Sequence, residues 1–596
     1  MIDFFKKNKE IVRKIVFILT DEQKKIGFGI LVCSFVGALF EVIGVSTILP
    51  LVQAFMNSDE LMKNNKVQLL VQLFHIKNST ELILLITFGI IIIFLIKNLY
   101  FILLSWLRIK YSCKVSRELS SSMMRRYMQR GYEFFLTVNT AEVSRNISAD
   151  VSGVNTMLYQ LLRILIESLT ILLIVVYMML TDWMMAISVM FLAALCLLLI
   201  YGYFRKKMRK AGELYNKYNG LSGKYIIQAI HGIKEILVLN KRNYFVNNFE
   251  KANELKQKGM IEQTVGSESP AYIIEGICVS GLLSTVCLRI IFGSTNVINL
   301  LPALSAFAVG AFRILPSLGR ISSAMNTILY YIPSLNHVYD NLKATSEYEC
   351  YLEKNDVAES ITEFKDSIRA VDIEWHYKNS DKQVLSKLNI EIKRGDSVAF
   401  VGPSGAGKTT LADIILGLLH PQDGELLIDG KNVAKLNNID FSKIMGYVPQ
   451  AVYLTDDTIR NNVAFGIEPK DIDDSQVWKS LEKAQIKDFV EKLPEGLDTM
   501  VGDRGIRFSG GQRQRIAIAR AMYADPDIII FDEATASLDG ETENAVMDSI
   551  TTLQGDKTLI IIAHRLSTIK ECDVIYEIKD GIATKKSYEE IIKNDE

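Results

Sequence analysis

The sequence predicts an α-helical six-span transmembrane domain followed by an α/β domain of the P-loop type. Apolar residues make up 49% of the 596-residue chain, and long runs of them are concentrated in its first half. From about Ser367 onward, short β-rich runs alternate with helical segments, and a glycine-rich loop follows one of these runs. This uneven distribution argues against a wholly soluble chain.

The balance of charges argues against a nucleic-acid partner. Lys and Arg number 67 against 68 Asp and Glu, and the net charge of -1 gives no field that would attract a polyanion. The seven cysteines include no C-x-x-C pair, and the six histidines lack the spacing of metal ligands. We therefore expect neither a disulfide framework nor a structural metal.

Six apolar runs meet the length of about 20 helical residues that a bilayer requires. Residues 183–204 contain no charged side chain, so they lack the polar face that a soluble helix needs. The last two runs are weaker candidates, because they contain charged residues or prolines. The six runs are 26–56, 82–107, 158–181, 183–204, 271–292 and 297–318.

The basic residues predict the orientation of these runs. The segments that follow the second and fourth runs, starting at Arg108 and Arg205, are rich in Lys and Arg, whereas the link at Asp182 has none. Cytoplasmic segments close to spans are enriched in these residues. Both ends of the chain are therefore expected in the cytoplasm.

These features divide the chain into four parts. Residues 1–25 suit an amphipathic helix on the inner membrane face, with a basic tail as the alternative, and they do not fit a signal peptide. Residues 26–340 form the transmembrane domain, whose long cytoplasmic connections are low in Pro and Gly and are expected to continue the membrane helices. Residues 341–366 are a charged linker, and residues 367–596 form the α/β domain.

A phosphate-binding loop follows the apolar run 398–401. From Gly402 to Thr409 the sequence reads GPSGAGKT, which matches G-x-x-x-x-G-K-[ST] between a strand and a helical segment. Glycines let backbone N–H groups surround a phosphate, Lys408 would neutralise the terminal phosphates, and the Thr409 hydroxyl would ligate Mg²⁺. A glycine-rich loop without function is the alternative, and the next motif argues against it.

The second motif is a buried strand that ends in two acidic residues. From Ile528 to Glu533 the sequence reads IIIFDE. One carboxylate is enough to hold Mg²⁺, so we assign Asp532 to the metal and Glu533 to polarising the attacking water. The expected cofactors are ATP and Mg²⁺.

Between these motifs the chain carries a signature sequence, FSGGQRQR, which begins at Phe508. With it, the sequence resembles the ABC ATPase family, although Phe508 stands where that family usually has Leu. The resemblance implies catalytic roles for Glu533, His564 and Gln450, and metal contacts by Thr409, Gln450 and Asp532. It also implies nucleotide contacts by Tyr377, which would stack on adenine, and by Gly402, Ser404, Gly405, Gly407, Lys408, Thr409, Thr410, Ser509, Gly510, Gly511, Gln512 and the D-loop residue Asp539.

The same resemblance implies that the chain pairs with a second one. In this family the signature of one ATPase domain faces the P-loop of another, so a single domain cannot complete a site. Because Glu533, His564 and the signature are all intact, a homodimer is favoured over an unequal heterodimer.

Six spans followed by an ATPase domain resemble a half-size ABC exporter of the type IV fold. This implies a protein of the bacterial inner (cell) membrane with a cytoplasmic ATPase domain, and it places the family's coupling helices near residues 140–150 and 219–225. The membrane half is most similar to PglK-type flippases, in EVIGVSTILP from Glu41 and RILPSLGR from Arg313. The resemblance implies flipping or export of a lipid-linked oligosaccharide, a polyprenyl-pyrophosphate glycan, with a general lipid or multidrug exporter as the alternative.

Three cations lie within or beside the apolar runs, and they agree with an anionic substrate. A cation at mid-bilayer costs about 2.5–3.5 kcal/mol, so Lys97, Arg313 and Arg320 are expected to face a watery interior, where they would attract a pyrophosphate. The alternative is that they pair with Glu41, Glu167 or Glu275 and hold the bundle together. An ATP-gated channel and a soluble DNA-maintenance ATPase fit the six spans and the intact hydrolytic set less well.

Overall fold

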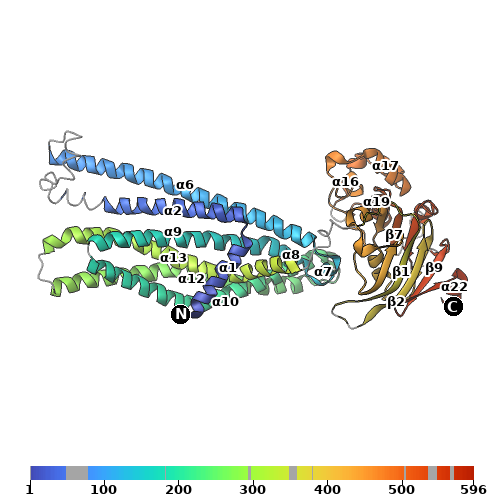
Figure 1. Ribbon diagram of the computed structural model, residues 1–596, viewed down its shortest axis with the longest axis horizontal. Helices are drawn as coiled ribbons and strands as arrows, with labels where there is room; N and C mark the ends of the chain where they lie inside the picture. Colours follow the sequence, from blue (N-terminus) through green and yellow to red (C-terminus); the bar gives the residue numbers. More distant parts are fainter. Residues whose placement is uncertain are drawn as a thin grey trace. The chain divides into compact units, whose positions relative to one another are not determined.

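The computed structural model describes residues 2–47, 51, 55, 78–181, 183–292, 297–347, 359–378, 380, 382–502, 505–533, 547–563 and 569–595. The chain divides into two compact units (Figure 1). Unit 1 holds Met1–Arg130 and Thr137–Glu349, and unit 2 holds Gly131–Leu136 and Cys350–Glu596. The first unit is helical and the second is α/β, which confirms the predicted fold class.

Unit 1 contains long helices that continue well past the apolar runs. The 50 residues of α6 correspond to about 75 Å of helix, more than twice the thickness of the hydrocarbon layer. The cytoplasmic connections are therefore extensions of membrane helices, as their composition predicted. The long helices are α2 (Asp21–Ser46), α6 (Ser79–Met128), α9 (Val151–Thr181), α10 (Trp183–His231), α12 (Arg242–Phe292) and α13 (Val297–Glu347).

Length and apolar composition single out three membrane-crossing helices among the residues that the structure describes. They are Asp21–Ser46, Thr80–Met128 and Thr140–Leu180. The first of these is preceded by a capping box, in which the Thr20 hydroxyl accepts from the Gln23 backbone N–H at 3.3 Å. Before it, α1 (Ile2–Ile18) lies against α13, where the Phe17 and Tyr339 rings meet at 5.1 Å.

One of the two expected connections is wrong, and the other stays a prediction. Residues 219–225 lie inside the continuous helix α10, and the connection to α12 instead contains the short helix α11 (Ile233–Val238). Residues 140–150 form α8 (Thr140–Arg145) and the π-helix Asn146–Asp150, which lead directly into α9. The segment that is grouped with unit 2 comes earlier and contains most of the short helix α7 (Tyr132–Thr137).

Unit 2 is built on two sheets. The four-stranded sheet has the order β2-β1-β4-β5, and the six-stranded sheet has the order β10-β9-β3-β8-β7-β6, with parallel pairing from β9 to β6. The antiparallel strands are β1 (Ser367–His376), β2 (Gln383–Lys393), β4 (Asp423–Ile428), β5 (Lys431–Asn432) and β10 (Ile582–Lys586). The parallel strands are β3 (Ser397–Val401), β6 (Met445–Val448), β7 (Ile528–Asp532), β8 (Thr558–Ile562) and β9 (Val574–Lys579).

Both faces of the parallel strands are buried, which explains their continuous apolar runs. Phe400 and Ile530 belong to the core on one face, and Ala399 and Phe531 to the core on the other. The helices of unit 2 are α14 (Lys408–Ile415), α15 (Asn438–Ile444), α16 (Ile459–Val463), α17 (Asp474–Lys483), α18 (Lys487–Glu491), α19 (Gly510–Met522) and α22 (Tyr588–Asp595).

Candidate nucleotide site and membrane charges

The P-loop connects the carboxyl end of β3 to α14. Gly402 and Gly407 have φ angles of +138° and +102°, a region that favours glycine. A Cβ on Gly402 would lie 2.2 Å from the Ile578 carbonyl oxygen, so no other residue fits there without displacing backbone. The loop is thus held against β9 while its outer residues Ser404 and Gly405 are exposed.

Lys408 is folded back onto this loop. Its ammonium donates to the carbonyl oxygens of Gly402 at 2.8 Å and Pro403 at 3.1 Å, and the residue is only 5% exposed. Burial lowers the pKa of Lys408, and the nearby Glu533 and Asp532 oppose this effect. A phosphate in the loop would offer this buried charge a stronger acceptor than two neutral carbonyls.

Two acidic residues stand at the carboxyl end of β7, the strand next to the edge strand β6 of the parallel sheet. Asp532 is buried, and Glu533 has a φ of +48°, an uncommon conformation for a side chain of this size. The Glu533 backbone N–H donates to the Ile562 carbonyl at 3.2 Å, which fixes this turn. Gln450, which follows β6, donates from Nε2 to Glu533 Oε2 at 2.5 Å. The structure therefore brings Gln450 and Glu533 together.

The residues present fit Mg²⁺ held together with a nucleotide. Thr409 lies exposed in the first turn of α14, and the buried Asp532 supplies a carboxylate oxygen. Mg²⁺ usually binds one or two protein carboxylates and the substrate phosphates, rather than a cage of protein ligands. No group of three His, Cys, Asp or Glu suited to a metal occurs among the described residues.

The signature sequence forms the start of α19. Ser509 is the N-cap: its hydroxyl accepts from the Gln512 N–H at 3.3 Å, while its own N–H donates to Gln512 Oε1 at 2.9 Å. Ser509 and Gly510 are exposed, whereas Gly511 is buried. Phe508 is buried and its ring meets Phe489 at 6.0 Å, so the larger side chain is accommodated in the core.

Of the other expected site residues, Tyr377 and Thr410 are described by the structure and two are not. Tyr377 follows β1 and is 40% exposed, and its ring packs edge-on against Trp375 with the ring centroids 4.4 Å apart. Thr410 is buried next to Lys408. His564 and Asp539 lie outside the described residues, and their roles remain predictions.

Two residues that the sequence interpretation missed lie beside Asp532. Burial and the Asp532 carboxylate raise the pKa of Asp413, on α14, to about 6. The Tyr447 hydroxyl, on β6, donates to Asp532 Oδ2 over 3.4 Å, a long hydrogen bond. Asp413 stands four residues after Thr409 and so shares its helical face, a periodicity that could have indicated it.

A third missed feature is the segment Gly131–Leu136, which belongs to unit 2 although it follows membrane helix α6. Glu133 forms an ion pair of 3.2 Å with Lys378, the neighbour of Tyr377. The pKa of Tyr132 is raised first by burial and then by Asp413, Tyr377 and Asp532. Only tertiary structure brings this segment to the candidate site, and no local sequence signal marks it.

Of the three expected cations, the two whose side chains are described, Lys97 and Arg320, are both paired. Lys97 lies 3.3 Å from Glu41 and is 1% exposed, so the expectation that it faces a watery interior is wrong. Arg320 forms two bonds with Glu167, at 2.5 and 3.0 Å, but remains 40% exposed. The side chain of Arg313 lies outside the described residues. The alternative of structural pairing therefore holds for Lys97 and Arg320.

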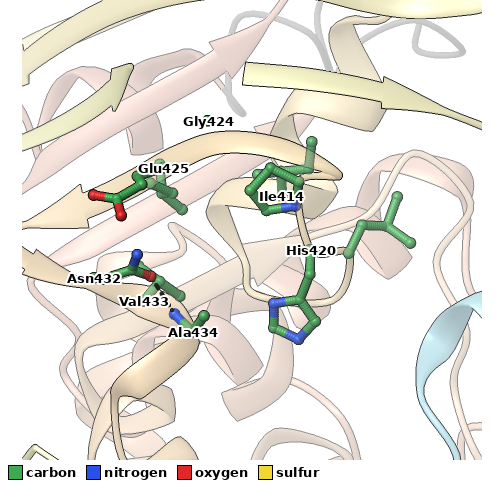
Figure 2. Close-up of a pocket in the computed structure, with 10 residues that line it drawn as sticks. Ile414, His420, Gly424, Glu425, Asn432, Val433 and Ala434 are labelled. Carbon is green, nitrogen blue, oxygen red and sulfur yellow. Dashed lines mark hydrogen bonds between the residues drawn. The ribbon is translucent and has the colours of Figure 1, made fainter. Parts of the chain in front are cut away.

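A cavity of about 100 Å³ lies where α14 ends, and Figure 2 shows His420 and Asn432 among its lining residues. It is smaller than the roughly 300 Å³ at which ligand pockets begin. Burial lowers the pKa of His420, so its imidazole is neutral near pH 7. These features favour a structural role for His420.

Comparisons with known proteins cover most of the chain. Residues 385–536 match the family "ABC transporter" and residues 28–265 match "ABC transporter transmembrane region". An ATP-dependent lipid A-core flippase of Desulfotalea psychrophila is 30% identical, over 78% of this chain and 80% of the relative. The heterocyst differentiation ATP-binding protein HepA of a Nostoc species is also 30% identical, over 77% of this chain and 74% of that relative. The solved structure of a bacterial Atm1-family ABC exporter with ATP bound is similar with a TM-score of 0.77 at 23% identity. The match covers 94% of this chain and 96% of that one.

Proposed function

Because the chain belongs to the ABC transporter family, we propose that it is an ATP-driven flippase of a lipid-linked oligosaccharide. The coarser statement needs no proposal: the chain has the architecture of a half-size ABC exporter, with a transmembrane domain and a cytoplasmic domain that hydrolyses ATP to drive transport. The substrate, the pairing and the roles of individual residues are the proposal.

For hydrolysis, we assign each step to a residue whose position supports it. Lys408 exchanges the carbonyls of Gly402 and Pro403 for phosphate oxygens. Glu533 orients and polarises the attacking water, and its bond to Gln450 keeps the carboxylate in place until a water takes over. Mg²⁺, held by Thr409 and Asp532, would supply positive charge against the phosphates.

For pairing, we propose a homodimer with two composite sites. Ser509 and Gly510 are exposed at the start of a 13-residue helix, where backbone N–H groups and the helix dipole favour a phosphate. Mixed dimers with Lys408→Ala in one chain and Ser509→Ala in the other should keep one intact site, whereas both changes in one chain damage both sites. Equal ATPase activity in the two arrangements would refute the shared site.

For the substrate, the observation that carries the proposal is the set of charges in the membrane helices. Apolar drugs gain nothing from charge at membrane depth, whereas a lipid pyrophosphate does. Arg320 can act in this way because 40% of its side chain stays exposed while it holds Glu167. The relatives named lipid A-core flippases support a lipid substrate. A general lipid or multidrug exporter is the second candidate.

The deciding experiment measures translocation in proteoliposomes. Flipping of a fluorescent polyprenyl-pyrophosphate oligosaccharide should require ATP and should stop in Glu533→Gln protein. Export of an apolar dye serves as the competing assay. ATP-dependent dye export without any flipping of the glycolipid would favour the multidrug exporter.

A further inference from the structure

We infer that Arg108 and Arg163 form a binding site for a phosphate-bearing lipid head group at the cytoplasmic membrane boundary. The inference deepens the proposed function and rests on it for the direction of transport. It moves the substrate contact away from Lys97, whose charge the structure neutralises, to two arginines that have no acidic partner.

The first support is the pairing of charges. Lys97 and Arg320 each have a carboxylate within 3.3 Å, so these two pairs carry no net charge. For Arg108 and Arg163, by contrast, no carboxylate pairs with the guanidinium anywhere in the described part of the chain. Two positive charges therefore stay uncompensated near the apolar layer, where charge is costly.

The second support is unsatisfied polar atoms. Arg108 Nε and Gln160 Oε1 are both buried without a hydrogen-bond partner among the described residues. The Arg108 guanidinium carbon lies 5.7 Å from the centre of the Tyr159 ring, which places it beside the helix turn that carries Gln160. Buried polar groups are rarely left unpaired, so such a pair of atoms points to a missing ligand or water.

The third support is the position of these groups on α9. Thr156, Gln160, Arg163 and Glu167 recur at intervals of three and four residues, so they share one helical face. Leu165 and Leu172 lie on the opposite face and are 45% and 58% exposed, as lipid-facing side chains are. The polar face therefore points into the bundle, where Glu167 meets Arg320 of α13.

The fourth support is depth. Arg108 directly follows the apolar run of α6, and the apolar run of α9 begins at residue 158. The segment that follows α6 belongs to the cytoplasmic domain, so both of these helix ends lie at the inner leaflet. A guanidinium there matches phosphate oxygens in charge and in its paired N–H groups, and stacking on Tyr159 keeps Arg108 in place.

The test compares binding of undecaprenyl pyrophosphate with that of undecaprenol to the full-length protein in detergent. The double variant Arg108→Gln/Arg163→Gln should bind undecaprenyl pyrophosphate with lower affinity, by about tenfold for each guanidinium lost. Each charge-assisted hydrogen bond contributes about that factor to the binding constant. Undecaprenol, which lacks the phosphates, should bind wild type and variant alike. Arg117→Gln, also on α6 but 76% exposed, is the matched control and should change nothing.

Two further measurements distinguish free pyrophosphate from a lipid head group as the ligand, and a lost contact from a misfolded variant. If sodium pyrophosphate at millimolar concentration competes with the lipid, the site recognises the phosphate itself. The variant Arg108→Lys/Arg163→Lys keeps both positive charges, so it should bind the lipid more tightly than the double Gln variant, and this gain would exclude a folding defect. Equal binding of the two lipids by wild type, or unchanged affinity in the double Gln variant, would overturn the site. Tight binding without translocation would leave the site standing and reject the flippase function instead.

Discussion

The buried ion pair between Lys97 and Glu41 makes the sharpest prediction about the membrane domain. Replacing Lys97 with Met keeps an unbranched side chain, one atom shorter, but removes the cation that lies 3.3 Å from the Glu41 carboxylate, which is 14% exposed. Removing one partner of a buried pair costs about 3–5 kcal/mol, because the remaining charge is uncompensated. For a unit as large as this one the unfolding midpoint shifts by roughly 1.4 °C per kcal/mol, so it should fall by about 4 °C or more.

The double variant Lys97→Met/Glu41→Leu distinguishes a structural pair from a substrate contact. Replacing a buried pair by apolar residues is often neutral or stabilising, so the double variant should recover the wild-type midpoint. Intrinsic tryptophan fluorescence during heating in nanodiscs measures this cycle, and flipping in proteoliposomes reports the function. If Lys97→Met melts like wild type, the pair contributes nothing and the reasoning fails. If the double variant is stable but cannot flip, Lys97 contacts substrate after all.

Three further predictions concern unit 2. Glu533→Gln should lower phosphate release by about 10²-fold or more while nucleotide binding is kept, and near-normal turnover would remove Glu533 from catalysis. The pKa of Asp413 is raised to about 6, so the folded domain retains a proton that the unfolded chain loses, and stability falls as pH rises from about 4 to 6. In metal-free buffer Asp413→Asn should therefore raise the free energy of unfolding at pH 7.5 by up to about 3 kcal/mol, and by less at pH 5; an equal gain at both pH values would contradict this. Reversing Glu133 or Lys378 alone should reduce stimulation of ATPase activity by substrate, and exchanging both charges should restore it; a double exchange as defective as the single changes would count against the pair.

Sequence alone predicted the fold class and the nucleotide motifs because their signals are local. The P-loop must contain glycines where φ is positive, and the parallel strands must be apolar on both faces, so each leaves a pattern within a few residues. Phe508 shows the same logic, since its packing against Phe489 required only another apolar residue.

The parts that sequence could not predict depend on contacts between distant residues. Residues 219–225 read as a connection and include Gly220 and Gly223, but α10 continues through both glycines to His231. The choice between ion pairs and free cations was left open, because Arg320 and Glu167 are 153 residues apart and meet only when α9 packs on α13. The placement of Glu133 beside Lys378 is of the same kind.

The two membrane ion pairs should differ in strength, and the reason lies on α9. Arg163 stands four residues before Glu167, a spacing at which oppositely charged side chains can pair along one helix. If Arg320 is replaced by Gln, Glu167 therefore has a second cation within reach, and Arg320 is also 40% exposed before the change. We expect Arg320→Gln to lower the unfolding midpoint less than Lys97→Met does, and to weaken undecaprenyl pyrophosphate binding because Arg163 becomes engaged with Glu167. Adding Glu167→Gln to Arg320→Gln should release Arg163 and restore that binding, whereas continued loss of affinity would show that Arg320 itself holds the phosphate.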